Sequence, residues 1–191
     1  MGDDPTPEII ADVALGLGDR AVRAANRTLR PSPLDLVFDV SLAGCVHGGP
    51  VYNAATGQRL NAEWFRVAIT NSSAHVIEGV RVQAISLKPD TLGTLPVQLH
   101  RMHDNPPPGQ PYEQATIVPV SKTPVVFADV VSHIDGSPVF QMLHSVPAIE
   151  PWFPVGSYEL VLSVTGQDVK PRERTFTLAL IDGRIQFSRL R

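Results

Sequence analysis

Two runs of alternating apolar and polar residues, separated by a short polar segment, constrain the fold of this chain more than any other feature. In the first run Phe65, Val67 and Ile69 occupy every second position, and the run around Val82 follows the same pattern. Side chains on a β-strand point alternately to opposite faces, so each run can bury one face in a core and leave the other in water. The segment between them, Asn-Ser-Ser at 71 to 73, is typical of a turn. This stretch predicts two strands joined by a polar turn.

Similar short patterns recur along the chain, and 18 prolines and 14 glycines favour many short elements over long helices. No helical pattern separates the strands, which indicates an antiparallel sandwich. We therefore predict an all-β, antiparallel, immunoglobulin-like (Ig-like) β-sandwich of about eight to ten strands with an N-terminal helix. The other expected strands are 34 to 41, 95 to 99, 112 to 120, 124 to 132, 139 to 143, 156 to 164, 174 to 180 and 185 to 190, and the expected core is Phe38, Val67, Ile69, Val82, Phe127, Tyr158, Leu160, Leu162 and Phe176.

The first 30 residues predict a helical extension. Residues 34 to 191 predict the sandwich domain. Apolar residues at Ile10, Val13 and Leu17 recur at helical spacing, and the Arg-Pro-Ser-Pro segment at 30 to 33 ends the helix because proline cannot continue it. The near-continuous apolar character of 124 to 132 predicts a strand buried on both faces, with the helix as one possible cover.

A stripe of arginines lines the second half of that helix. Arg20, Arg23, Arg27 and Arg30 recur at intervals of three or four residues. The stripe has two interpretations: a contact for an acidic or phosphate-bearing partner, or a solvated face that favours the negative end of the helix dipole.

Charge, cysteine content and hydropathy exclude several classes of protein. A net charge of −3 provides no strong field toward nucleic acid or anionic membrane. Cys45 is the only cysteine, so no intrachain disulfide forms. The sequence contains neither a signal-peptide pattern nor an apolar run long enough to span a membrane, which predicts a cytoplasmic location.

Two glycine- and proline-rich segments are the expected binding loops. One is Gly44 to Gln58 and the other is His103 to Tyr112; segments of this length inside a compact domain often bind ligands. For the first segment, a small β-hairpin around Tyr52 is an equal alternative. The residues expected to contact a partner are Tyr52, His103, Asp104 and Tyr112 in these loops, with Arg20, Arg23 and Arg27 on the helix.

Metal binding is the main chemical alternative. Cys45 and His47 share a face if their segment is extended, and His100 and His103 follow later in the chain. No second Cys or His pair with metal-ligand spacing accompanies them, and none of the usual phosphate-loop or nucleophile-elbow motifs occurs. The segment from His133 to Ser137 holds His, Asp and Ser in one tight turn, whereas a triad needs these groups to converge from separate elements. We expect no catalytic residue, no metal and no cofactor.

Two motifs carry a resemblance to known families. A strand that ends in Asn-Ser-Ser at 71 to 73 and precedes Val80, together with Gly-x-Tyr-x-Leu at 156 to 160, resembles disulfide-free bacterial Ig-like adhesion and cell-surface modules. The segments Leu-Pro-Val-x-Leu-His-x-Met-His-Asp-Asn at 95 to 105 and Val-Thr-Gly-x-Asp-Val at 164 to 169 are similar to an uncharacterised bacterial family with a C-terminal Ig-like domain. This second resemblance covers 34 to 190 and implies no catalytic residues. The first resemblance, to Ig-like modules, implies a tyrosine in the late strand whose hydroxyl bonds to backbone.

These observations favour a non-enzymatic recognition or assembly module that binds a protein partner through its loops and its N-terminal helix. The alternatives are a metal-binding or metal-dependent hydrolytic domain that uses Cys45, His47, His100 and His103, and a structural subunit of a larger homo-oligomeric assembly. We expect a protein partner or self-association, no nucleic acid and no membrane span.

The helix provides the first testable prediction. An apolar stripe around Val13 would lie in water unless it packs on another surface, and the stiff link at 30 to 33 favours a surface on a second chain. Light scattering of the full chain should therefore give a mass above that of the monomer, and deletion of residues 1 to 30 should lower it to the monomer. Identical monomeric masses, with no loss of thermal stability on truncation, would contradict this prediction.

Overall fold

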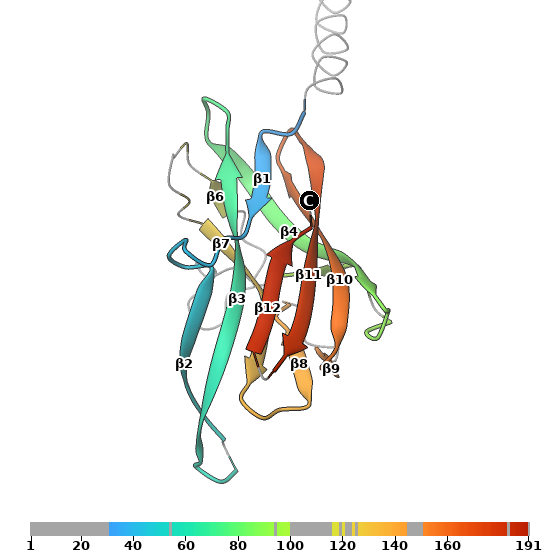
Figure 1. The fold of residues 1–191 in the computed structure, drawn as a ribbon. Coiled ribbons are helices and arrows are strands. Elements are labelled where there is room, and N and C mark those ends of the chain that lie inside the picture. Colours follow the sequence, from blue (N-terminus) through green and yellow to red (C-terminus); the bar gives the residue numbers. More distant parts are fainter. Residues whose placement is uncertain are drawn as a thin grey trace, which may run out of the picture.

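The chain folds into two antiparallel β-sheets in the computed structural model, which describes residues 31–53, 55–93, 95–99, 116–118, 120, 124, 126–144, 151–182 and 184–190. The sheets share one apolar core, so the described part has the two layers of a β-sandwich (Figure 1). No helix occurs within these ranges, and therefore no helix long and apolar enough to cross a membrane was found there. The helical extension expected in the first 30 residues lies outside them.

The first sheet has the order β1-β3-β7-β8-β9, and β2 also pairs with β3. β1 and β2 both pair with β3, β1 at residues 68 to 71 and β2 at residues 59 to 65. In Figure 1 the hairpin of β2 and β3 extends beyond the other strands of this sheet. The strands are β1 (Leu34–Val37), β2 (Val46–Tyr52), β3 (Arg59–Asn71), β7 (Val126–Ile134), β8 (Val139–Met142) and β9 (Trp152–Pro154).

The second sheet has the order β12-β11-β10-β4-β5, and β6 pairs with β4. A hairpin with its turn at Asp182 joins β11 to β12. The strands are β4 (Ile77–Lys88), β5 (Val97–Gln98), β6 (Thr116–Val118), β10 (Ser157–Gly166), β11 (Val169–Ile181) and β12 (Arg184–Arg189).

The two strands that the sequence predicts around 63 to 87 both form, as β3 and β4, but they belong to opposite sheets. The chain crosses between the sheets at Asn71, whose side chain is buried. Asn71 Nδ2 donates to the carbonyl of His75 at 2.8 Å and to that of Val118 at 3.2 Å, and Oδ1 accepts from the backbone N–H and hydroxyl of Ser73. All four hydrogen-bonding positions of this amide are therefore satisfied, which lets a polar group lie inside the crossover without a desolvation penalty.

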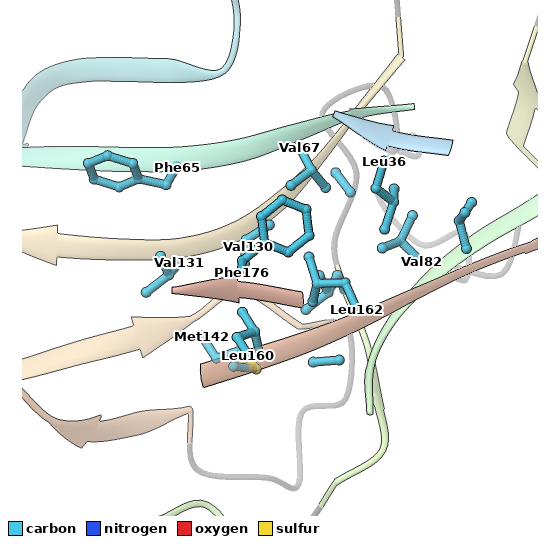
Figure 2. Packing of buried hydrophobic residues seen from close by; sticks show 14 of the residues in the cluster. Leu36, Phe65, Val67, Val82, Val130, Val131, Met142, Leu160, Leu162 and Phe176 are labelled. Atoms are coloured by element: carbon cyan, nitrogen blue, oxygen red, sulfur yellow. The ribbon is translucent and has the colours of Figure 1, made fainter. Parts of the chain in front are cut away.

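The core lies between the sheets, where alternate residues of each strand point inward (Figure 2). In this core, β10 contributes Leu160 and Leu162, which face Val67 from β3 and Val130 and Val131 from β7. The contact buries the inner faces of both sheets away from solvent. Of the nine expected core residues, seven belong to this cluster, and Phe38 packs against it half-buried. The exception is Phe127, which is buried on the other face of its sheet.

A loop covers that other face at Phe127. Residues 38 to 45 fold back so that Leu42 and Cys45 pack on Ala68 and Phe127. Gly44 has φ +102°, and a Cβ there would lie 2.7 Å from the Phe127 ring, so only glycine allows the loop to approach this closely. β7 is thus buried on both faces as expected, and this loop covers Phe127. The helix proposed as one possible cover lies outside the described residues.

The expected tyrosine contact is present in the late strand. Tyr158 begins β10 with its ring buried against Phe140 and Phe153, and its hydroxyl donates to the carbonyl of Pro154 at 2.8 Å. This bond satisfies a hydroxyl that the burial of the ring removes from most of the solvent.

The crossover at Asn71 generates the second prediction. In Asn71→Asp a carboxylate oxygen replaces the amide nitrogen and faces the carbonyls of His75 and Val118, so two buried hydrogen bonds are lost. We expect the free energy of unfolding to fall by about 2 to 4 kcal/mol in denaturant titrations at pH 7. Asn53→Asp is the matched control, because Asn53 Oδ1 accepts from two backbone N–H groups, and a carboxylate preserves both bonds. Equal effects of the two substitutions would contradict the prediction.

Candidate functional site

The residues expected to contact a partner are described only in part. Tyr52 lies at the end of β2, opposite Arg59, with 67% of its surface exposed. The segment from Gly44 to Gln58 forms the hairpin alternative: a strand followed by a turn in which Asn53 Oδ1 binds the following backbone N–H groups. The other expected contacts, Arg20, Arg23, Arg27, His103, Asp104 and Tyr112, lie outside the described residues.

Cys45 directly precedes β2 and His47 is in it, and the environments of the two side chains differ. The Cys45 side chain is fully buried, and burial raises the pKa of its thiol, which disfavours the thiolate that a metal requires. His47 is exposed, and its ring lies 5.5 Å from the ring of Trp64. Within the described ranges, no group of three or more His, Cys, Asp or Glu side chains could hold a metal. His100 and His103 fall outside those ranges.

The His133 to Ser137 turn does not assemble a triad. His133 is buried against Phe140, and its Nε2 lies 3.0 Å from the carbonyl oxygen of Ser137. The Ser137 hydroxyl instead donates to the carbonyl of Val139. The imidazole therefore holds the turn together and does not contact a nucleophile.

One line of residues crosses the outer face of the first sheet, the face directed away from the core. The strand register pairs His47 with Trp64, Trp64 with Ser132, Ser132 with Gln141, and Gln141 with Trp152. Directly paired residues on neighbouring strands project to the same face, so these five side chains form one continuous line over β2, β3, β7, β8 and β9. We call it the cross-strand row. It contains both tryptophans of the chain, with their backbones separated by three strand spacings, or about 14 Å.

The polar members of the row bond to one another. The Ser132 hydroxyl donates to Gln141 Oε1 at 3.3 Å, and Ser132 is buried between its larger neighbours. Next along β3, Arg66 Nε lies 2.6 Å from Asp129 Oδ1, with each side chain 14% exposed, so these two charges neutralise each other. Trp152 is 46% exposed on the edge strand β9. The row therefore contains no carboxylate, lysine or arginine, and it is open to solvent at its ends.

A second group of side chains, which we call the arginine cluster, surrounds Asp35 of β1. Arg174 from β11 contacts this carboxylate side-on: its Nε is 2.6 Å from Oδ1, and its Nη2 donates to Oδ2 at 2.8 Å. Arg172 Nε lies 3.8 Å from Oδ1, and Arg189 Nη1 lies 3.8 Å from Oδ2. Because Asp35 is in the first sheet and the arginines are in the second, the cluster connects the two layers.

The ionisation of Asp35 depends on these contacts. Burial by itself raises the pKa of the carboxyl, but hydrogen bonds from Arg174 and from the Leu36 N–H, with the charges of Arg174 and Arg189, outweigh it. The pKa of Asp35 therefore lies below its ordinary value of 3.8.

Sequence reasoning found neither site. Trp64 and Trp152 are 88 positions apart, and Asp35 and Arg174 are 139 apart. The sequence does indicate that Trp64 and Gln141 point outward, because the residues next to them in their strands are core residues. It does not indicate which strands lie side by side or in which register, since these depend on long-range pairing.

Comparison with family models, curated proteins and solved structures finds no match to this chain. The resemblance to Ig-like modules therefore stays a prediction.

The ion pair of Asp35 generates the third prediction. A carboxyl whose pKa is lower in the folded state contributes stability above its unfolded pKa, and this contribution is lost as the pH falls through the folded pKa. We expect Asp35→Asn to lower the free energy of unfolding by about 1 to 3 kcal/mol at pH 7, because three arginines then lack their counter-charge. Thermal unfolding from pH 7 to pH 2 should show the variant and the parent converging below pH 3.8.

Asp135→Asn, at an exposed turn, is the control and should change stability little at any pH. A gap between Asp35→Asn and the parent that does not vary with pH would contradict the assignment.

Proposed function

We propose that this chain is a non-enzymatic recognition module that binds a protein partner across the cross-strand row. The observation that carries the proposal is the register, which brings both tryptophans and His47 onto one line of an outer sheet face. Tryptophan is among the residues enriched at protein interfaces and at their energetic centres, since a large ring removes much apolar surface from water with little loss of side-chain entropy.

The charge and hydrogen bonding of the face favour a protein over other ligands. Arg66 and Asp129 neutralise each other beside the row, so the face provides no field for a polyanion. Ser132 and Gln141 bond to each other, which leaves few free hydrogen-bonding groups for a ligand rich in hydroxyls. Aromatic contact therefore dominates the row, and apolar side chains of a protein provide the matching surface.

The hairpin of β2 and β3 extends this surface. His47 is in β2, and its ring lies 5.5 Å from that of Trp64. The exposed Tyr52 lies five positions further along the same strand, so its side chain projects to the opposite face and is not part of the row. The recognition surface that we propose is thus a sheet face with the part of the adjoining hairpin around His47.

The fourth prediction tests the row directly. A photo-crosslinking amino acid at position 141, in the middle of the row, should form an adduct with a defined protein in cells, whereas the same group at position 81, exposed on β4 of the other sheet, should not. With that partner purified, Trp64→Ala and Trp152→Ala should each weaken binding roughly 30-fold, as expected for removal of a central aromatic side chain. Arg81→Ala should leave the affinity unchanged.

Tryptophan emission gives a second measurement, because both tryptophans of the chain are in the row, and saturation by a partner must change the emission. Circular dichroism verifies that each variant stays folded. Unchanged affinity in both tryptophan variants would contradict the proposal. An adduct between two copies of this chain would assign the row to a homo-oligomeric assembly. Binding to a glycan without any protein adduct would show that the ligand is a glycan and contradict the proposal of a protein partner.

A further inference from the structure

The arginine cluster contains more positive charge than its ion pair requires. Arg172, Arg174 and Arg189 are paired across the second sheet with the core residues Val164, Leu162 and Phe176, so their side chains project between the sheets, toward β1. Among the residues that the structure describes, the one carboxylate that meets them there is that of Asp35. Three guanidinium groups and one carboxylate give a net charge of about +2 at neutral pH.

Asp35 satisfies one of the three arginines. Arg174 uses two of its nitrogens on the two carboxylate oxygens, at 2.6 and 2.8 Å. At 3.8 Å, Arg172 and Arg189 are beyond hydrogen-bond distance from the same oxygens. In the described part of the chain, Arg172 Nε and Arg174 Nε are both buried and neither makes a well-aligned hydrogen bond, but Arg174 Nε lies 2.6 Å from Oδ1 and Arg172 Nε lies 3.8 Å from it. Two guanidinium groups next to one carboxylate therefore keep donors that Asp35 does not occupy.

The side chains of two of these arginines are partly open to solvent, although the Nε atom of Arg172 is buried. The side chains of Arg172 and Arg189 are 33% and 37% exposed, whereas that of Arg174 is 17% exposed. The arginine nearest the core thus neutralises Asp35, and the two more exposed arginines flank it. An anion between these two would place its oxygens against planar groups whose N–H donors match two oxygens at once.

We propose that Arg172 and Arg189 form a binding site for a phosphate group. A phosphate monoester carries about −1.5 to −2 charges at pH 7 and has three acceptor oxygens. It therefore matches the excess positive charge, and the guanidinium donors of Arg172 and Arg189, better than a carboxylate with one charge does. The phosphate bridges the two arginines, and Arg174 screens it from Asp35. This site is separate from the cross-strand row and does not depend on the function proposed for it.

Thermal unfolding tests the proposal with inorganic phosphate as the probe. Sodium phosphate and sodium chloride are compared at equal ionic strength and pH 7.5, so that general screening cancels. At a phosphate concentration ten times the dissociation constant, we expect phosphate to raise the melting temperature at least about 3 °C above the value in chloride. O-phosphoserine in a parallel titration shows whether the site also accepts a phosphate attached to a larger molecule: an equal rise extends the site to phosphorylated ligands, and no rise restricts it to the free ion.

The double variant Arg172→Gln/Arg189→Gln preserves the ion pair of Arg174 and Asp35 and should abolish the difference between phosphate and chloride. Arg184→Gln, an exposed arginine at the other end of β12, is the matched control and should retain the difference. Because the two salts are compared within each variant, a change in its baseline stability does not affect the result.

Nuclear magnetic resonance of the parent chain provides a readout that needs no variant. The Nε–H resonances of Arg172 and Arg189 should shift with phosphate in a saturable manner and stay in place with chloride. Equal melting temperatures in phosphate and chloride, a phosphate effect that persists in the double variant, or the absence of saturable shifts would each overturn the proposal.

Discussion

The two-layer arrangement depends on the hydrogen bonds of one buried amide, that of Asn71. At this residue the chain leaves β3 in the first sheet, and after a few residues it enters β4 in the second. A sharp change of direction inside a sandwich leaves backbone groups without ladder partners, and buried groups of this kind are costly. The Asn71 side chain binds two of these carbonyls, and Ser72 binds the carbonyl of Pro33 just before β1. The crossover and the start of the first sheet are thereby held together, and the sheets can face each other across the core.

The arginine cluster shows how the lateral edge of the sandwich combines stability with charge. Asp35 and Arg174 connect β1 to β11 across the gap between the layers, and this contact belongs to the fold. Arg172 and Arg189 add positive charge that the fold does not need for that contact. Repulsion between like charges at close range lowers the stability of the fold. When an anion is bound between them, the same charges contribute favourably to stability. The same few residues can therefore stabilise the edge and make stability depend on an anion.

The outer face of the first sheet illustrates how a sheet collects side chains from distant parts of the chain. Antiparallel pairing through five strands aligns His47, Trp64 and Trp152 although no two of them are close in sequence. A rigid, paired backbone fixes the spacing of these rings before any partner binds, so little conformational entropy remains to be lost on association. On this basis the recognition surface that we propose lies on a sheet face and one hairpin, and a flexible loop is not required.

Local patterns in the sequence determined most of the strands and their inward faces, because side-chain alternation and turn chemistry act over a few residues. The contact of Tyr158 was implied by the resemblance to Ig-like modules. Most core residues, from Val67 to Phe176, followed from the same period of two. Tertiary structure alone decided that β3 and β4 separate into different sheets, that the loop at Cys45 covers Phe127, and which side chains meet in the row and the cluster. These features depend on strand order and register, which arise from pairing between segments far apart in the chain. Alternation shows which face of a strand is buried, but it does not specify which strand lies beside it.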